Sequence, residues 1–246
     1  MRCSFTVFGF GGKEDRFPFP ASYKIYETDL TSSARNSELE MFLSAVNNAS
    51  HMVSQIYFIR HGETEWSLSG QHTGRTDLPL TENGESAARK LAVSLRQKNF
   101  SRVFTSPRRR AQRTCELAGL GVAAEIEPDL AEWDYGDYEG QRSAEIRTAR
   151  PDWNIFRDGC PNGESPAQIC ARADRLIVRL RALTGEVVLF SHGHFGRVLA
   201  ARWIGLDVAQ AQHFVLSTAS CSVLGYEPNA AQAPAILLWN AASVAS

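Results

Sequence analysis

Residues 55–63 read Gln-Ile-Tyr-Phe-Ile-Arg-His-Gly-Glu. The first five are rich in β-branched and aromatic side chains, which is typical of a β-strand. Arg60 and His61 follow at once, and Gly62 lets the backbone turn sharply and approach a ligand closely. In open α/β sheets, ligands bind beyond the carboxyl ends of the strands. The stretch therefore predicts a strand that carries a histidine to a binding site.

A second strand of this kind also ends at a histidine. The apolar run 186–190 has the composition of a buried strand, and it leads into Ser191, His192, Gly193 and His194. One histidine after a strand can be an ordinary loop residue. Two His-Gly pairs after two strands are much harder to attribute to chance, so we interpret both as parts of one site.

Strands and helices alternate from residue 52 onward. Thr81 is placed to cap a helix over 82–98, and Ser165 with Gln168 forms a capping box for another helix. The remaining predicted elements are a strand over 102–105, a helix from Ser106-Pro107 to about 118, a helix over 195–204, and late strands over 214–226 and 235–239. This alternation predicts an α/β fold with three layers, α/β/α, around a mostly parallel central sheet.

Residues 1–51 show neither helical nor strand periodicity, apart from a possible short helix over 37–47. We expect a weakly ordered N-terminal extension there and a single domain over 52–246. Because Met52 stands directly ahead of the first strand, one hypothesis is that the start was assigned too early. An organelle-targeting peptide is disfavoured by the acidic residues of the segment.

Composition restricts the partners. A net charge of −1 over 246 residues leaves no electrostatic footprint for nucleic acid or an anionic membrane. No apolar run reaches the ~18 residues of a membrane helix, and no secretory signal is evident. The five cysteines are odd in number and widely spaced, which favours a reducing compartment such as the cytoplasm over a disulfide framework or zinc site. The sequence is silent on oligomeric state.

Positive and acidic residues gather near these strand ends. Arg60 precedes the first histidine, and the run 108–110 places three arginines at a predicted helix start, where anions are favoured. A charged helix surface is the ordinary role for two of the three. The loop 130–140 contains glycines, aromatic residues and four acids: Glu132, Asp134, Asp137 and Glu139. An acid beside aromatic rings can have a raised pKa and donate a proton, so each of the four is a candidate proton donor.

Taken together, these motifs resemble the histidine phosphatase superfamily, also called phosphoglycerate mutase-like. Its hallmark is the run 60–64, Arg-His-Gly-Glu-Thr, and the resemblance covers about 55–226 with the motifs in order. It implies His61 as the nucleophile and Glu132, in the Leu-x-Glu…Gly…Glu-Gly motif, as the proton donor. It implies that Arg60, Arg110 and His192 complete the phosphate pocket.

The resemblance also implies substrate-binding residues. Ser67 lies where many members have Asn, and Thr73 with Gly74 matches a second contact loop. Tyr135 corresponds to a substrate-contacting tyrosine of the mutase branch, and Gly193 follows the pocket histidine. No cofactor or metal is expected, because arginines and histidines take the place of a metal ion. His192 and His194 have a spacing that could suit a metal, but no carboxylate cluster accompanies them.

The implied chemistry has two steps. Neutral His61 attacks phosphorus in line, while Arg60, Arg110 and a protonated His192 stabilise the equatorial oxygens. Glu132 protonates the leaving alkoxide and then deprotonates the water that hydrolyses the phosphohistidine. The resemblance thus implies a metal-independent phosphatase whose partner is a small-molecule phosphate ester.

Three alternatives stay open. A phosphoglycerate mutase would share the pocket, but Gly140 and Glu186 lie only 46 positions apart, which is short for a substrate-closing lid. The stretches 65–81 and 132–140 resemble fungal sedoheptulose-1,7-bisphosphatases, which implies a sugar phosphate or bisphosphate; bacterial relatives with such motifs include broad acid phosphatases. An idle binding protein on the same fold is the third alternative. Aromatic side chains are interpreted as pocket wall or ordinary packing (Trp66, Trp133, Tyr135, Tyr138) and as core (Trp153, Trp203).

Overall fold

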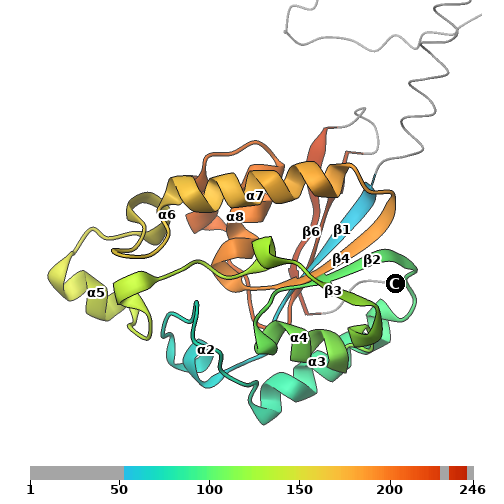
Figure 1. The fold of residues 1–246 in the computed structure, drawn as a ribbon, viewed down its shortest axis with the longest axis horizontal. Coiled ribbons are helices and arrows are strands. Elements are labelled where there is room, and N and C mark those ends of the chain that lie inside the picture. Colours follow the sequence, from blue (N-terminus) through green and yellow to red (C-terminus); the bar gives the residue numbers. More distant parts are fainter. Residues whose placement is uncertain (1–52, 228–232, 243–246) are drawn as a thin grey trace, which may run out of the picture. The chain divides into compact units, whose positions relative to one another are not determined.

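A computed structural model describes residues 53–227 and 233–242, so the predicted extension over 1–51 lies outside the described residues. The strands of the described part form one six-stranded sheet with the order β3-β2-β4-β1-β5-β6 (Figure 1). In chain order they are β1 (Val53–Arg60), β2 (Phe100–Thr105), β3 (Ala124–Ile126), β4 (Gly185–Ser191), β5 (Cys221–Tyr226) and β6 (Pro234–Ala241).

The sheet is mostly parallel, as predicted. β1 pairs with β4 in parallel, and β4, β2 and β3 continue in the same direction. β5 and β6 add an antiparallel edge beside β1. Because β1 and β4 are parallel central neighbours, with Arg60 opposite Ser191, the histidines that follow them leave the sheet side by side.

Helices cover both faces of the sheet, which confirms the three-layer α/β/α prediction. α7 (Pro166–Arg181) and α8 (Gly193–Trp203) pack on one face, and α3 (Glu82–Leu95) and α4 (Arg109–Leu117) pack on the other (Figure 1). Alternate residues of β1 serve the two cores, because strand side chains point to opposite faces in turn. Ile56 and Phe58 belong to the first core, and Tyr57 and Ile59 belong to the second.

Shorter helices lie in the connections between these elements. They are α2 (Glu65–Ser69), α5 (Ser143–Ala149) and α6 (Ile155–Asp158), with 3-10 turns at Gly121–Ala123, Pro128–Leu130, Gly136–Tyr138 and Val208–His213. Two predicted caps are confirmed. The Thr81 hydroxyl accepts a hydrogen bond from the Gly84 amide at the start of α3, and Ser165 and Gln168 form the capping box of α7.

Several predicted boundaries differ from those of the structure: α3 ends at Leu95 rather than 98, and β2 begins at Phe100 rather than 102. α4 begins at Arg109, with Arg108 rather than Ser106 as its N-cap. The Ser106 hydroxyl bonds to a histidine and also accepts from the Arg108 amide at 3.3 Å. α8 begins at Gly193, two residues earlier than predicted, which makes His192 its N-cap. The late strand begins only at Cys221. The chain before it leaves the sheet to reach the pocket, where the Leu216 carbonyl accepts a hydrogen bond from Arg60.

The large aromatic side chains divide between packing and pocket. Trp153 and Trp203 are buried in the core as expected, at 3% and 1% exposure. Trp133 is fully buried and donates to the Glu164 carbonyl, and Tyr138 packs edge-on against Trp153. Within 53–227 and 233–242, no helix is both long and apolar enough to cross a membrane.

Candidate functional site

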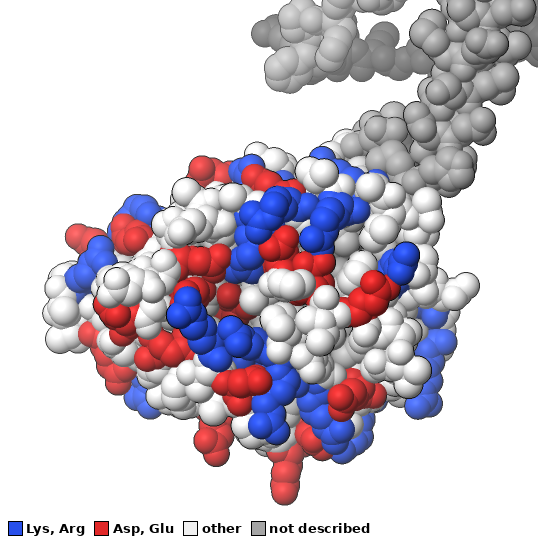
Figure 2. Space-filling model, viewed as in Figure 1, with Lys and Arg blue, Asp and Glu red and all other residues white. Residues whose placement is uncertain are grey.

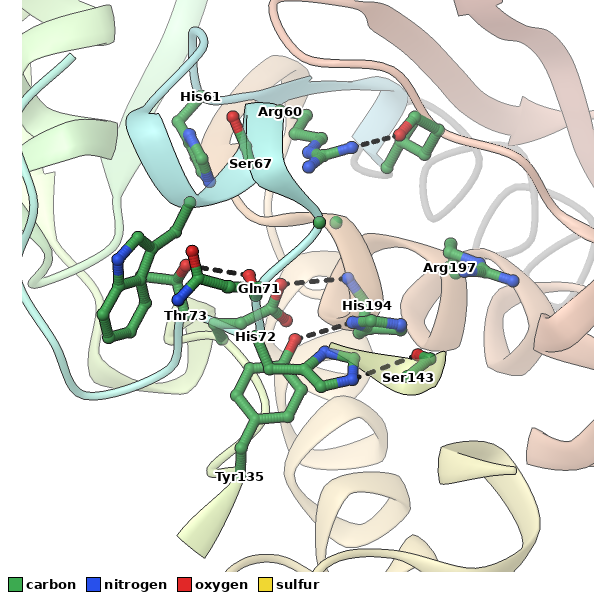
Figure 3. A pocket seen from close by; sticks show the side chains of 15 residues that line it. Arg60, His61, Ser67, Gln71, His72, Thr73, Tyr135, Ser143, His194 and Arg197 are labelled. Carbon is green, nitrogen blue, oxygen red and sulfur yellow. Dashed lines mark hydrogen bonds between the residues drawn. The ribbon is translucent and has the colours of Figure 1, made fainter. Parts of the chain in front are cut away.

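A cavity of about 240 Å³ opens beyond the carboxyl ends of β1 and β4 (Figure 3). Its walls come from separate segments: the end of β1, the α2 region, the 132–135 loop, α5 and the start of α8. The lining residues are Arg60, His61, Trp66, Ser67, Gly70, Gln71, His72, Thr73, Glu132, Tyr135, Ser143, Gly193, His194, Arg197 and Leu216.

His61 lies at the inner end of this cavity and is 5% exposed. Its Nδ1 is 2.7 Å from the Gly62 carbonyl oxygen. A carbonyl only accepts, so Nδ1 carries the ring proton and Nε2 keeps a free lone pair. Burial, and then the charges of Arg110 and Arg60, hold the pKa of His61 well below its ordinary value. The ring is therefore neutral at neutral pH.

Gly62 is required by a close approach of two backbone segments. A Cβ added to Gly62 would lie 2.5 Å from the carbonyl oxygen of Gly84, in the first turn of α3. The Gly62 amide also donates to the Thr114 hydroxyl on α4, at 3.0 Å. The turn that carries His61 is thus fixed against the two helices on one face of the sheet.

His192 faces His61 from the start of α8. The two ring centroids are 5.2 Å apart, and His192 is fully buried. Its Nε2 lies 2.7 Å from the Ser106 hydroxyl, while Nδ1 is buried with no hydrogen-bond partner among the described residues. Burial and the charge of Arg110 lower the pKa of His192 well below its ordinary value. This ring is therefore neutral rather than protonated.

The arginines differ in how the protein holds them. Arg60 lines the cavity and donates to the Leu216 carbonyl. Arg110 is fully buried and donates to the carbonyl oxygens of Thr73, Thr76 and Gly74 at 2.8, 2.9 and 3.2 Å. Arg109 is exposed and Arg108 half-buried, so Arg110 is the one buried member of the run 108–110.

Several buried side-chain nitrogens near His61 and His192 have no hydrogen-bond partner. Within the described part of the chain, these are the Nε atoms of Arg60, Arg108 and Arg110 and the Nδ1 of His192. Leaving a buried donor without an acceptor typically costs about 1–3 kcal/mol. Three of the four atoms belong to guanidinium groups, so this set is suited to binding an anion.

The structure separates the four acidic candidates of the 130–140 loop. Glu132 alone lines the cavity, where its Oε1 accepts from the Trp133 and Phe195 amides at 2.9 and 2.8 Å, and its Oε2 accepts from the His194 amide at 3.0 Å. The other three serve the loops: Asp134 pairs with Arg75, Asp137 accepts from Asn162, and Glu139 accepts from the amides of Gly74 and Thr76.

Arg172 on α7 holds the loop that carries Glu132. It donates to the carbonyl oxygens of Asp129 and Ala131 at 2.8 and 2.7 Å and pairs with Glu164 at 2.7 Å. Its guanidinium also lies 4.6 Å from the ring centroid of Phe195. One side chain thereby links the acid loop to the start of α8.

The expected substrate-binding residues lie mostly at the cavity. Ser67, Thr73, Tyr135 and Gly193 line it. The Ser67 hydroxyl is also part of the α2 capping box, bonded to the backbone of Thr64. Gly74 does not line the cavity. Its amide donates to Glu139 and its carbonyl accepts from Arg110.

Sequence reasoning missed the wall farther from His61. His72 stacks on Tyr135 with 4.6 Å between ring centroids, and its Nε2 lies 3.2 Å from the Ser143 hydroxyl. Tyr135 in turn bonds to His194, and Arg197 lies farther along α8 (Figure 3). His194 had a sequence signal, because it follows the second His-Gly pair. His72 and Ser143 had none, because a contact between loops 71 residues apart leaves no local pattern.

On the face seen in Figure 2, no second concentrated cluster of positive charge stands out. Figure 2 shows lysine and arginine interspersed with aspartate and glutamate on the face in view. Among the residues that the structure describes, no group of three or more His, Cys, Asp or Glu side chains is arranged to hold a metal ion. The charged and imidazole side chains that line the cavity are instead two arginines, three histidines and one carboxylate: Arg60, Arg197, His61, His72, His194 and Glu132.

Comparisons with known proteins agree with this geometry. Residues 56–241 match the family model described as "Histidine phosphatase superfamily (branch 1)". An acid phosphatase of Mycobacterium tuberculosis is 43% identical over 177 residues, covering 70% of this chain and 87% of that protein. The sedoheptulose 1,7-bisphosphatase of Saccharomyces cerevisiae is 41% identical over 182 residues, covering 61% of this chain and 67% of the yeast protein.

Two solved structures have folds similar to that of this chain. The product of an open reading frame from Mycobacterium tuberculosis superposes with a TM-score of 0.71 at 37% identity, covering 76% of this chain and 97% of that one. A mycobacterial glucosyl-3-phosphoglycerate phosphatase superposes with a TM-score of 0.64 at 25% identity, covering 76% and 99%.

Proposed function

Because the chain belongs to the histidine phosphatase superfamily, we propose that it hydrolyses a small phosphorylated sugar through a phosphohistidine formed on His61. Its relatives include several phosphatases, and the enzyme class follows from them. The observation that carries the proposal is the set of buried, unpartnered N–H donors beside a neutral histidine with a free Nε2.

The phosphoryl group of the substrate occupies the space between these donors. The guanidinium groups of Arg60 and Arg110 and the Nδ1–H of His192 supply the hydrogen bonds, and the fold holds these groups in place before the substrate binds. Phosphoryl transfer depends mainly on such alignment and charge stabilisation. The buried Arg110 cannot move away, because three backbone carbonyls hold it.

His192 performs this role in its neutral form. We assign the Ser106 hydroxyl as the donor to Nε2, because the same oxygen already accepts from the Arg108 amide at 3.3 Å. The single ring proton then lies on Nδ1, where no acceptor among the described residues competes for it. The sequence-based expectation of a protonated His192 is therefore not needed for a hydrogen bond to phosphate. A neutral donor also avoids adding a fourth positive charge beside Arg60, Arg108 and Arg110.

The reaction then proceeds in two balanced steps. The Nε2 lone pair of His61 attacks phosphorus as the bond to the leaving oxygen breaks, and Glu132 gives its proton to that oxygen. Glu132 next takes a proton from water, the hydroxide attacks phosphorus, and the P–N bond breaks to release phosphate. Three backbone amides fix the carboxyl group, and the remaining lone pair of Oε2 is left for the exchanged proton.

Water is the proposed acceptor rather than a second substrate hydroxyl. Between Gly140 and β4 the chain is used for α5, α6 and α7, and α7 packs on the sheet instead of covering the cavity. A mutase needs a site that shields the phosphohistidine from water until the second hydroxyl arrives. The short connection favours hydrolysis.

A sugar body fits the rest of the cavity. Gln71, His72, Ser143 and His194 give the distal wall a row of neutral hydrogen-bonding groups, and Tyr135 provides an aromatic surface. Polar hydroxyls can pair with such groups, whereas an apolar leaving group would leave them unpaired. The yeast relative, a sugar bisphosphatase, supports the same substrate class.

The test is a panel of sugar phosphates, including sedoheptulose 1,7-bisphosphate and 3-phosphoglycerate, assayed for phosphate release by purified enzyme. His61→Ala is expected to lose phosphate release and acid-labile phosphate trapping by at least ~10⁴-fold, with His213→Ala as an exposed control histidine. Substantial residual turnover in His61→Ala would refute the nucleophile assignment. Rapid interconversion of phosphoglycerates without phosphate release would refute hydrolysis in favour of a mutase, and binding without turnover would identify an idle protein.

A further inference from the structure

A second cavity, of about 240 Å³, adjoins the cavity that leads to His61, which we call the first cavity. Glu132 lines both of them. Thr73 lines the first cavity, and the adjacent Gly74 lines the second. In the same way, the next-but-one residues after Glu132 are divided between the two, because Asp134 lines the second cavity and the following tyrosine lines the first. These two short segments therefore form the wall between the cavities, and Glu132 belongs to both sides of it.

Three arginines line the second cavity, and two of them are paired with acids that also line it. Arg172 forms a salt bridge with Glu164 at 2.7 Å. Arg75 forms one with Asp134 at 2.5 Å. The third arginine, Arg108, is half-buried and forms no salt bridge with any described residue, and its buried Nε has no hydrogen-bond partner among them. Of the three, Arg108 is therefore the one that can donate to a ligand.

The third acid of the second cavity is Glu132, which also forms no salt bridge with a described residue. While Glu132 is ionised, its charge balances that of Arg108. Once Glu132 is protonated, three arginines face two ionised acids, and a bound anion restores the balance. Binding of an anion in the second cavity and binding of a proton by Glu132 therefore favour each other, and this coupling is reciprocal.

Other charged and titratable groups face Glu132 from the first cavity. Besides Glu132 itself, that cavity is lined by Arg60, Arg197, His61, His72, His194 and Tyr135. Burial lowers the pKa of Arg110 and the charge of Glu132 raises it, so this arginine also lies within reach of the carboxylate. Of the two cavities, Arg108 lines only the second, which keeps its charge available to a ligand other than the substrate.

We propose that the second cavity is a binding site for inorganic phosphate, which Arg108 binds, and that the bound anion stabilises the protonated, proton-donating form of Glu132. The guanidinium group suits a tetrahedral oxyanion, because it offers two parallel N–H donors. The inference rests on the proposed function for the role of Glu132, whereas the binding itself does not depend on it. Phosphate is the product of the proposed reaction, so it competes with substrate in the first cavity and promotes proton donation from the second.

The kinetic test measures the rate of enzyme phosphorylation on the alkaline side of the pH optimum, with substrate at saturation so that added phosphate is excluded from the first cavity. The measured quantity is the ratio of the rate with a ³²P-labelled sugar phosphate to the rate with p-nitrophenyl phosphate. Nitrophenolate leaves without a proton, so only the first rate depends on protonated Glu132. We expect inorganic phosphate to raise the ratio about three- to tenfold, as the alkaline limb moves by ~0.5–1 pH.

Arg108→Met should have a raised ratio without phosphate and no response to it, because the charge that opposes protonation of Glu132 is gone. Arg108→Lys keeps that charge and should keep part of the response. Arg109→Met is the matched control, because Arg109 is the adjacent exposed arginine and lines neither cavity. A merely structural role of Arg108 would lower both rates and leave the ratio unchanged. That result, or a response in Arg108→Met equal to that of the wild type, would overturn the proposal.

Binding is measured separately by ¹⁵N NMR of the arginine Nε–H groups during titration with inorganic phosphate. The Arg108 signal, identified by its loss in Arg108→Met, should shift on titration. The shift should persist in Arg110→Met, in which the phosphate pocket of the first cavity is impaired. A signal that does not move shows that the site is absent. If it moves but no phosphohistidine forms on His61, the proposed function has failed and the phosphate site stands.

Discussion

Replacing Glu132 by glutamine separates proton donation from every other role of this side chain. The carboxylate accepts three backbone N–H bonds, two at Oε1 and one at Oε2. A glutamine can keep its oxygen toward the Trp133 and Phe195 amides, but its NH₂ then faces the His194 amide, donor against donor. One buried N–H loses its acceptor, so the free energy of unfolding should fall by about 1–3 kcal/mol.

The catalytic effect should depend on the leaving group. An alkoxide from a sugar must be protonated as it leaves, and losing a positioned general acid costs roughly 10²–10⁴-fold. A nitrophenolate leaves without a proton, so its release should fall by less than about tenfold. The assay is the single-turnover rate of enzyme phosphorylation, measured with a sugar phosphate and with p-nitrophenyl phosphate. Using this first step excludes the role of Glu132 in the later hydrolysis.

Glu139→Gln is the control, because Glu139 belongs to the same loop and also accepts backbone N–H bonds, from Gly74 and Thr76. Its replacement should lower stability without discriminating between the two leaving groups. If Glu132→Gln slows both substrates equally, Glu132 acts by holding the site together and the proton-donor reasoning is refuted. If Glu139→Gln shows the discrimination instead, the wrong acid has been assigned.

Two further predictions follow from buried groups near the cavity. Arg110→Met removes a guanidinium that donates to three backbone carbonyls. The inhibition constant of inorganic phosphate should rise about 100-fold, and the free energy of unfolding should fall by about 3 kcal/mol. An unchanged inhibition constant would show that Arg110 only supports the loop. For His72, burial lowers the pKa from 6.5 to about 4. Between these two pH values the unfolded chain is protonated at His72 and the folded protein is not. The free energy of unfolding should therefore fall by up to about 3 kcal/mol as the pH falls from 6.5 towards 4. His72→Gln should flatten urea-unfolding stability across that window, and a pH dependence equal to that of the wild type would contradict the assignment.

Much of the fold follows from local patterns. The strand over 55–59, the Thr81 cap and the 165–168 capping box depend on residues that are neighbours in the chain, and the structure contains all three. The location of the site follows as well, because parallel strands end at one edge and both His-Gly pairs follow such strands. The predicted start of the antiparallel strand β5 is too early, because residues 214–220 are strand-like in composition but contact the cavity and β6 instead.

Local sequence pattern could not identify the acid that lines the pocket. Glu132, Asp134, Asp137 and Glu139 are equivalent in composition, and only the family resemblance singled out the first. In the structure Glu132 faces the cavity because α8 presents its free N-terminal amides there and Arg172 anchors the loop from α7. Both causes come from segments 40 or more residues away, so they leave no mark near residue 132.

The sequence by itself therefore determined the alternation of strands and helices, the two histidines at the strand ends and the family. These depend on side-chain periodicity, capping and short motifs, which act over a few residues. Only the tertiary structure decided that Ser106 turns to His192, that His72, Tyr135 and His194 form one wall, and that buried N–H donors surround His61 without an acceptor. Those features arise from desolvation and hydrogen bonding between distant segments, which exist only once the chain has packed.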